Sequence, residues 1–328
     1  MTLSCRSAFG IGAASVLALS VIGMTPAAAE WKPVKPVEFV VMAGQGGGAD
    51  KLARFIQSII EKNKFAEVPF IPINKGGGSG ADALRYLMDS KGNDHVIMAT
   101  LNSYYTTPLR NPGIGVNIEE FTPIARLAED TFVLWVNAAS DVKSVDDYVK
   151  MVKEKGTGWK MGGTGTGQED SLVTSMIEQA YGLKMTYVPF KGGGDVAVNL
   201  VGKHVDSTVN NPSEAIGFQQ ADKLRPLASL TKDRITEFKD LPTFKELGKD
   251  ELVYRMQRSI VAPGGIKPEV VEYYKGVFDK VFKSAEWNDY CKKNALQCSW
   301  LAGDDLKNYF KEETAKHQAL LKQMGEIQ

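Results

Sequence analysis

The sequence lacks the residue groupings that most enzymes need. Its only histidines are His95, His204 and His317, and none has a cysteine or carboxylate partner at metal-ligand spacing. No G-x-S-x-G, H-E-x-x-H or G-x-x-x-x-G-K-[ST] motif occurs, which argues against a serine hydrolase, a zinc protease and an ATPase. We therefore expect no catalytic residue, no bound metal and no cofactor.

The sequence also has no net charge and only three cysteines. Lys plus Arg and Asp plus Glu balance at 39 each, so there is no basic surplus to attract nucleic acid or an anionic membrane. A negative solute must then be recognised by local geometry. Of three cysteines, Cys291 and Cys298 follow the leader, and they form either a disulfide or two buried thiols. Both readings are structural.

Long apolar runs are confined to the N-terminus. Arg6 precedes an apolar stretch at residues 11–24, and three alanines at 27–29 end it. This pattern predicts a cleavable export signal peptide at residues 1–29. Cys5 precedes the apolar stretch, which argues against a lipid anchor, and no later run approaches the ~20 residues of a membrane span. The remaining chain is expected to be soluble and exported.

Short β-rich runs then alternate with amphipathic helical stretches. Strands are predicted at 37–42, 68–73 and 95–99, with helices at 49–62 and 81–88 between them. A second series follows, with strands at 132–136, 159–161, 185–190 and 205–210, and helices at 144–155, 172–181 and 196–201 between them. The order predicts two α/β units with parallel strands and right-handed crossovers. Crossing segments are expected near 127–131 and 228–231.

Four glycine-rich loops lie where a predicted strand ends and a helix begins, at 44–48, 76–80, 162–167 and 192–194. A helix start leaves backbone N–H groups unpaired and carries partial positive charge, and glycine permits close approach of a ligand. Ligands of open α/β sheets bind beyond the carboxyl ends of strands. The four loops together therefore predict an anion site.

Other interpretations of these loops are weaker. One such loop alone would read as a tight turn. Asp50, Asp170, Asp195 and Ser213 occupy positions of helix caps, which would use some of the same N–H donors. Residues 44–49 fit a loose dinucleotide-binding pattern, but the next predicted strand ends in Asn-Lys instead of the acidic residue that a ribose needs.

At these loops the sequence resembles the periplasmic substrate-binding proteins of tripartite tricarboxylate transporters, also called Bug receptors. The similarity runs through VPFKGGG at 188–194, VD at 205–206 and NPS at 211–213. Further stretches similar to the family are FTPIA at 121–125, LRPLA at 224–228, DLPT at 240–243 and APGG at 262–265. Singly these are weak, but their order is specific, and they cover nearly the whole chain after the leader.

The resemblance implies an α/β fold of the type II periplasmic-binding-protein kind, a two-lobed clamshell. Each lobe would be a mostly parallel sheet flanked by helices, and two crossing segments would join the lobes. Lobe 1 is expected at 30–128 plus 230–328 and lobe 2 at 129–229. The implied location is the periplasm, and the implied partners are a small organic acid and the membrane subunits of the transporter. We expect a monomer and no nucleic acid.

The expected ligand-binding residues follow from the loops and the resemblance together. They are Gly44, Gln45, Gly46, Gly47, Gly48, Asp50, Gly78, Ser79, Asn102, Ser103, Thr164, Gly165, Thr166, Gly167, Gln168, Ser171, Lys191, Gly192, Gly193, Asp195, Asn211 and Arg258.

The sequence also departs from the family pattern. The first loop lacks the usual prolines, Ser171 replaces a common histidine, and Gln257-Arg258 replaces an aromatic pair. Two roles are open for Arg258: pairing with a ligand carboxylate, or an ion pair within the protein. Tyr104, Tyr105 and Phe190 are compatible with an aromatic acid or with core packing.

Three functions are compatible with these features. The first is a non-catalytic receptor that closes on a di- or tricarboxylate. The second is a secreted enzyme acting on a carboxylic acid, for which Asp50, Asp170 and Asp195 are the only candidate general bases. The third is a partner that presents the ligand to a sensor kinase.

Overall fold

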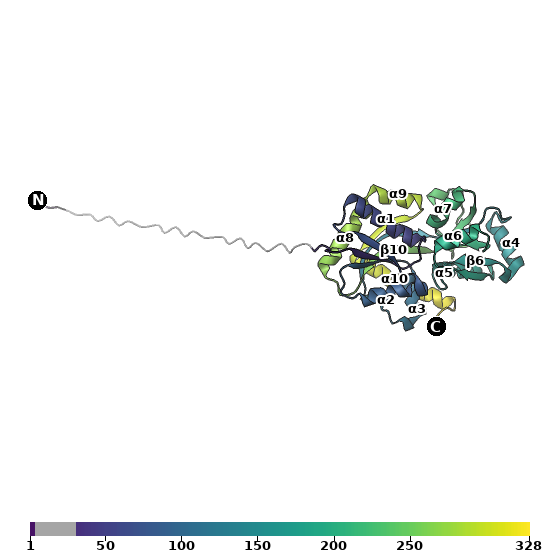
Figure 1. Ribbon diagram of the computed structural model, residues 1–328, viewed down its shortest axis with the longest axis horizontal. Coiled ribbons are helices and arrows are strands. Elements are labelled where there is room, and N and C mark those ends of the chain that lie inside the picture. The colour runs from purple at the N-terminus through teal and green to yellow at the C-terminus, as the bar shows by residue number, and fades with distance from the viewer. Residues whose placement is uncertain (4–30) are drawn as a thin grey trace. The chain divides into compact units, whose positions relative to one another are not determined.

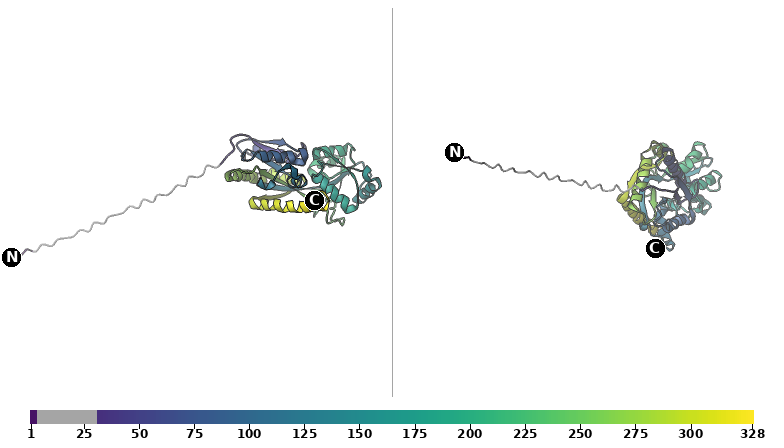
Figure 2. Two further views of the ribbon diagram at one scale, coloured as in Figure 1. Left: turned by 90° about the horizontal axis from the view of Figure 1, so that it is seen from below. Right: turned by 60° about the vertical axis from the view of Figure 1, so that its left-hand side comes forward.

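Two mixed sheets organise the part of the chain that the computed structural model describes, residues 1–3 and 31–328. The signal peptide predicted at 1–29 lies almost wholly outside the described residues. Residues 31–328 belong to one unit of contacts. Helices α4 to α7 gather beside one sheet, and α1 to α3 with α8 to α10 surround the other (Figure 1). A second viewing direction separates the same two groups of helices (Figure 2).

The first sheet has six strands in the order β11-β4-β10-β3-β1-β2. Strands β1 (Val37–Val41), β2 (Phe70–Asn74) and β3 (Val96–Thr100) pair in parallel, because helices connect them. Strands β10 (Arg255–Ala262), β4 (Thr122–Thr131) and β11 (Gln297–Ala302) extend the sheet by antiparallel pairs. The parallel half matches the prediction, while the antiparallel half joins segments more than 120 residues apart.

Six helices flank this sheet: α1 (Gly48–Asn63), α2 (Ala81–Asp89), α3 (Ser103–Arg110), α8 (Pro268–Lys283), α9 (Ala285–Lys293) and α10 (Gly303–Gln323). Helix α1 illustrates why they form. Its apolar residues recur at helical spacing, and Leu52, Ile56, Ile59 and Ile60 are buried while the intervening polar residues are not. Lys64 in the left-handed conformation ends α1.

The second sheet has five strands in the order β7-β6-β8-β5-β9. These are β5 (Val133–Asn137), β6 (Lys160–Gly163), β7 (Thr186–Pro189), β8 (Ser207–Thr208) and β9 (Leu224–Ser229). Strands β6, β7 and β8 are parallel, and β5 is antiparallel to both β8 and β9. The helices are α4 (Val145–Lys155), α5 (Glu169–Tyr181), α6 (Gly193–Val201) and α7 (Pro212–Gln220). Short 3-10 turns occur at Gly77–Gly80, Pro112–Ile114, Ile118–Glu120, Gly156–Gly158 and Thr236–Phe238.

The chain passes between the sheets at two places. Strand β4 continues to Thr131 and β5 begins at Val133, so the first crossing is at Phe132, just beyond the predicted segment 127–131. The N–H of Leu230 donates to the carbonyl of Phe132, and the N–H of Tyr254 donates to the carbonyl of Leu230, both at 3.0 Å. These bonds tie the outgoing and returning chain together beside Phe132.

The segment 231–249 lies with the second sheet, although the sequence placed it in lobe 1. Phe238 and Leu241 pack in a cluster with Trp135 of β5. Ser229 forms a bridge with Thr243, and Lys249 donates to the carbonyl of Ala180 at the end of α5. These contacts place the segment beside the second sheet, and the chain rejoins the first sheet at β10.

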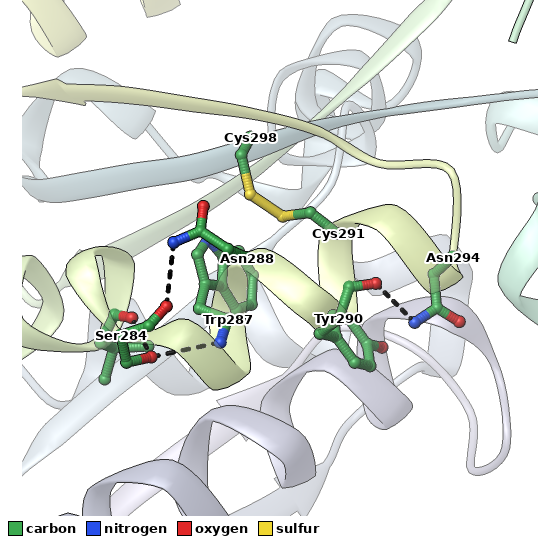
Figure 3. Close-up of a disulfide and its surroundings, with 8 residues drawn as sticks. Ser284, Trp287, Asn288, Tyr290, Cys291, Asn294 and Cys298 are labelled. Atoms are coloured by element: carbon green, nitrogen blue, oxygen red, sulfur yellow. Dashed lines mark hydrogen bonds between the residues drawn. A yellow bond between two sulfur atoms is a disulfide. The ribbon is translucent and has the colours of Figure 1, made fainter. Parts of the chain in front are cut away.

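Cys291 of α9 and Cys298 of β11 form a disulfide, with Cα atoms 6.0 Å apart (Figure 3). The Ser284 hydroxyl caps α9 by accepting from the N–H of Trp287 at 3.2 Å. Since Cys291 is buried and the bond spans only seven residues, the disulfide fixes the turn between α9 and β11.

Candidate functional site

Loops from both sheets meet around one small cavity. A cavity of about 30 Å³ lies between the start of α1 in the first sheet's half and the starts of α5, α6 and α7 in the other half. Nine of the predicted ligand-binding residues line it: Gly47, Gly48, Thr164, Gln168, Lys191, Gly192, Gly193, Asn211 and Arg258. The glycine loops at 44–48, 162–167 and 192–194 are thus neighbours in space.

The loops at 44–48 and 191–194 touch directly. A methyl group added at Gly44 would lie 2.5 Å from the carbonyl oxygen of Lys191, and one at Gly194 would lie 2.9 Å from the carbonyl oxygen of Gly46. Glycine is required here because two backbones from different sheets approach within contact distance. The two halves of the molecule are therefore closed on each other.

The loop at 76–80 contributes to closure at one side of the cavity. Ser79 has the left-handed conformation, with φ 58°, and follows Gly78 with φ 59°. The Ser79 hydroxyl donates to the carbonyl of Thr166 at 3.0 Å. A side chain at Gly165 would contact Ser79, and one at Gly167 would collide with Arg110. Ser79, Gly165, Thr166 and Gly167 thus form a direct contact between the halves, and these four residues and Gly78 lie outside the cavity lining.

The side chain of Asn102 is hydrogen-bonded within the first sheet's half of the molecule. Its amide donates to the carbonyl of Arg255 at 2.8 Å and to the hydroxyl of Tyr254 at 3.1 Å, and its oxygen accepts from the N–H of Gln257 at 3.0 Å. The neighbouring Ser103 N–H, at the start of α3, donates to the carboxylate of Glu169 from α5. Asn102 is therefore fully used by the fold, and Ser103 contacts the other half.

Four further predicted residues lie outside the cavity lining. The Asp50 carboxylate accepts from the N–H of Gly46 at 2.9 Å and pairs with Arg54, which braces the loop before α1. Gln45 and Asp195 are exposed. Ser171 is buried in α5, away from the cavity lining. Ser213 was expected to cap α7, but Asn211 is the cap.

The candidate aromatic residues belong to the packing. Tyr104 is buried and contacts the ring of Phe310, with centroids 5.0 Å apart. Tyr105 is buried against His317. Phe190 packs against the core of the second sheet. None of the three lines the cavity between the halves.

Three carboxylates that sequence reasoning did not assign to the ligand line the cavity: Glu169, Asp170 and Glu214. Asp170 accepts from the N–H of Thr164 at 2.9 Å. Glu214 completes a capping box with Asn211 and accepts from the main-chain N–H of that residue at 3.1 Å. The three-residue spacing of Asn211 and Glu214 is a sequence signal for this box.

Glu214 also reaches the other half of the molecule. Its carboxylate accepts from the N–H of Gly48, at the start of α1, at 2.8 Å. Together with Glu169 on the N–H of Ser103, this places protein carboxylates at the N-termini of both α1 and α3. The helix starts were expected to hold a ligand anion. Of the helix starts expected to do so, that of α1 already holds an acidic side chain of the protein in this closed arrangement.

Arg258 forms a buried ion pair with Asp130, and both residues are at most 3% exposed. The guanidinium Nε donates to Asp130 at 3.1 Å, and Nη2 donates to the amide oxygen of Asn211 at 3.1 Å. The pair connects β10 and β4 of the first sheet to the start of α7. Arg258 thus lines the cavity while its charge is already balanced.

Burial dominates the electrostatics of the carboxylates around the cavity. It raises the pKa of Asp170 well above its usual range, and the negative charge of Glu214 adds to the shift. Burial also raises the pKa of Glu169. For Asp130, burial outweighs the lowering effect of Arg258, so its pKa is raised as well. For Asp170 and Glu169, burial in the closed arrangement therefore makes the charged form costly.

Within residues 1–3 and 31–328, no group of three or more histidine, cysteine, aspartate or glutamate side chains is arranged to hold a metal ion. No helix of this described part is long and apolar enough to span a membrane.

Residues 52–326 match the family model described as "Tripartite tricarboxylate transporter family receptor". The chain belongs to this family. Among solved structures, the periplasmic binding protein BugD is similar with a TM-score of 0.84 and 20% identity, covering 89% of this chain and 98% of BugD. These values confirm the two-lobed α/β fold of periplasmic binding proteins.

Two further structures carry organic acids. R. palustris Rpa4515 with adipate has a TM-score of 0.83 and 23% identity, with 89% of this chain and 98% of that chain covered. MatC from Rhodopseudomonas palustris with bound malate has a TM-score of 0.80 and 18% identity, with 88% and 99% covered. The family receptor's fold therefore extends over almost all of the described chain.

Proposed function

We propose that this family receptor is exported to the periplasm, where it captures a small organic carboxylate between its two halves and delivers it to the membrane subunits of a tripartite tricarboxylate-type transporter. The observation that carries the proposal is the meeting of glycine-lined helix starts from both sheets around one cavity. Adipate bound to Rpa4515 and malate bound to MatC support a carboxylate as the ligand class.

Helix α6 is the helix start that we assign to the ligand carboxylate. Its N-cap is Gly192, no side chain caps the helix, and Gly192 and Gly193 line the cavity, with the Glu214 carboxylate next to Gly193. The first amides of a helix have no partner within it and carry partial positive charge. Lys191, also at the cavity, supplies an exposed positive side chain.

Binding requires the two halves to separate. The cavity of about 30 Å³ has room for about one or two water molecules, which is too little for a dicarboxylate. We propose lobes of residues 31–131 plus 254–328 and residues 133–249 that move about Phe132 and Leu230. A ligand that contacts both lobes favours the closed form, because only that form supplies donors from both.

Some contacts within the protein itself also favour the closed form. Lys51 donates to the carbonyl of Ser213 at 2.8 Å, and Gly48 donates to Glu214, so closure has favourable contacts without a ligand. Without ligand, the equilibrium between the open and closed forms then depends on two opposing effects. These hydrogen bonds favour the closed form, and burial of the carboxylates disfavours it. We propose that the protein has no catalytic step and works as a single chain.

The proposal is tested by isothermal titration calorimetry of the purified protein against succinate, malate, citrate, adipate, glutamate and phthalate. At least one acid should bind with a dissociation constant in the micromolar range or below, and small-angle scattering should show compaction on binding. If none of these acids binds, the proposal is contradicted. Delivery is tested by cross-linking the loaded and unloaded protein to membranes that contain the transporter subunits, and equal cross-linking in both states would contradict it.

A further inference from the structure

A second and larger cavity lies where the chain crosses between the two halves. Its volume is about 460 Å³. One wall belongs to the first sheet's half and consists of the end of β4, the end of α9 and the start of β11. The other wall comes from the segment 231–237 of the second sheet's half. We call this space the hinge cavity, and we call the cavity of about 30 Å³ between the glycine loops the loop cavity.

The strand order places the two cavities on opposite sides of the crossing strands. In the first sheet, β4 and β10 lie between β11, which lines the hinge cavity, and β3 and β1, whose following loops line the loop cavity. In the second sheet, β5 lies between β9, which leads into the segment 231–237, and the strands β8, β6 and β7, whose following loops line the loop cavity. Both sheets therefore put the crossing between the two cavities.

A buried ion pair connects the two cavities. Asp130 lines the hinge cavity, and its partner Arg258 lines the loop cavity. The crossing beside this pair is held by the hydrogen bonds from Leu230 to Phe132 and from Tyr254 to Leu230. A rotation of one half about this crossing therefore moves the walls of both cavities at once.

The walls of the hinge cavity are built so that they can move relative to each other. Cys291 and Cys298 both line it, and their disulfide stiffens the wall of the first sheet's half (Figure 3). The paired charges at the walls have partners in their own half: Arg234 pairs with Glu246, and Glu129 pairs with Arg255. These ion pairs therefore stay intact when the two walls approach or separate.

We propose that the hinge cavity widens as the loop cavity closes, so that residues lining the hinge cavity determine ligand affinity without touching the ligand. When two rigid halves turn about a fixed crossing, approach on one side of the crossing requires separation on the other. The volumes of about 460 and 30 Å³ agree with a closed loop cavity and a wide hinge cavity. In the open form the segment 231–237 would approach the end of α9.

A bulky side chain in the hinge cavity should therefore obstruct the open form and leave the closed form undisturbed. The apparent affinity of a ligand that needs the closed form rises with the fraction of protein that is already closed. The inference rests on the proposed function, because the ligand is taken to bind by closure of the loop cavity.

The test fills the hinge cavity from either wall. Lys292→Trp on α9 and Thr236→Trp on the opposite wall both change exposed residues of the lining, so neither replacement disturbs a core. Calorimetry with the acid that wild type binds most tightly should give a dissociation constant about fivefold lower or more, the gain expected when the closed fraction rises from about a fifth to nearly all. Small-angle scattering of each ligand-free variant should give the radius of gyration of loaded wild type.

Two controls separate filling from other effects. Lys292→Ala removes the same charge without filling the cavity, and it should keep the wild-type affinity. Lys293→Trp puts the same ring on the neighbouring exposed residue of α9, which does not line the hinge cavity, and it should also bind as wild type does. Circular dichroism shows whether each variant is folded, and the two filling variants allow the test to proceed if one of them is not.

The outcomes distinguish this inference from the proposed function. Unchanged or weaker binding by a folded filling variant would overturn the inference and leave the receptor function standing. Equal tightening in Lys292→Ala or Lys293→Trp would also overturn it, because the gain would not come from filling. If wild type binds no acid of the panel, the proposed function fails and scattering alone decides the inference: the filling variants should be more compact than wild type, and equal radii would overturn it.

Discussion

Replacing Gly44 by alanine is expected to hold the two halves apart without damaging either. The added methyl carbon would lie 2.5 Å from the carbonyl oxygen of Lys191, about 0.9 Å short of an ordinary contact of 3.4 Å. Gly44 does not have a left-handed backbone, so alanine causes no strain in its own loop. The loops must therefore separate by about that distance.

The energetic effect follows from the bond that separation breaks. The distance between the N–H of Gly48 and Glu214 is 2.8 Å, and an increase of about 0.9 Å takes it beyond hydrogen-bond range. A hydrogen bond to a charged group contributes about 1.5–3 kcal/mol. A ligand that needs this closed form should then bind about 10- to 150-fold more weakly.

The assays are calorimetry with a ligand of the wild-type protein and small-angle scattering of the ligand-free protein. Gly44→Ala should raise the radius of gyration without ligand and lower the free energy of unfolding by no more than the about 1.5–3 kcal/mol of the broken bond. Gly158→Ala, where a methyl group has no neighbour within 4 Å and φ is not positive, is the matched control. Wild-type affinity and radius in Gly44→Ala would refute the reasoning about direct closure.

Three further changes test the electrostatics and the disulfide. Asp170→Asn should stabilise the protein more at pH 8 than at pH 4: the raised pKa means that the Asp170 contribution is full below the usual value of 3.8 and is lost as pH rises through the raised pKa. Urea denaturation across this range measures it, and an effect independent of pH would contradict it. Cys291→Ser removes the bond to Cys298, and because the closed loop is short it should cost about 2–3 kcal/mol of unfolding free energy. Equal stability of reduced wild type and oxidised wild type in urea would argue against this figure. Arg258→Leu leaves the Asp130 carboxylate buried and unpaired, so it should destabilise by about 3–5 kcal/mol in the same assay. Adding Asp130→Asn should recover much of that loss, and an unchanged deficit in the double variant would contradict the pairing.

The local elements could be predicted closely from the sequence because each depends on its own periodicity. The strand expected at 37–42 is β1 (Val37–Val41), and the helix expected at 49–62 is α1 (Gly48–Asn63). The antiparallel pairing of β10 with β4 was not predicted. It joins Arg255 to Thr131 and depends on contacts between segments that show no signal in either one alone.

The candidate site shows the same division between local and long-range information. The glycine loops were expected to meet, and nine of the predicted residues line one cavity. The capping box of Asn211 and Glu214 has a recognisable spacing, but the bond from Gly48 to Glu214 spans 166 residues and follows only from closure of the two halves. Similarly, Phe238 packs beside Trp135 through a segment without regular periodicity, so this contact was not predicted.

The most direct test of the shared binding site is a crystal structure of the protein with the acid that binds most tightly in calorimetry. We predict that the ligand lies between the loops at 44–48 and 191–194, with its carboxylate at the amides that begin α6 and with contacts to both sheets. A ligand bound to one half alone, or in the separate pocket formed by Tyr104 and Phe310, would contradict the receptor site described above.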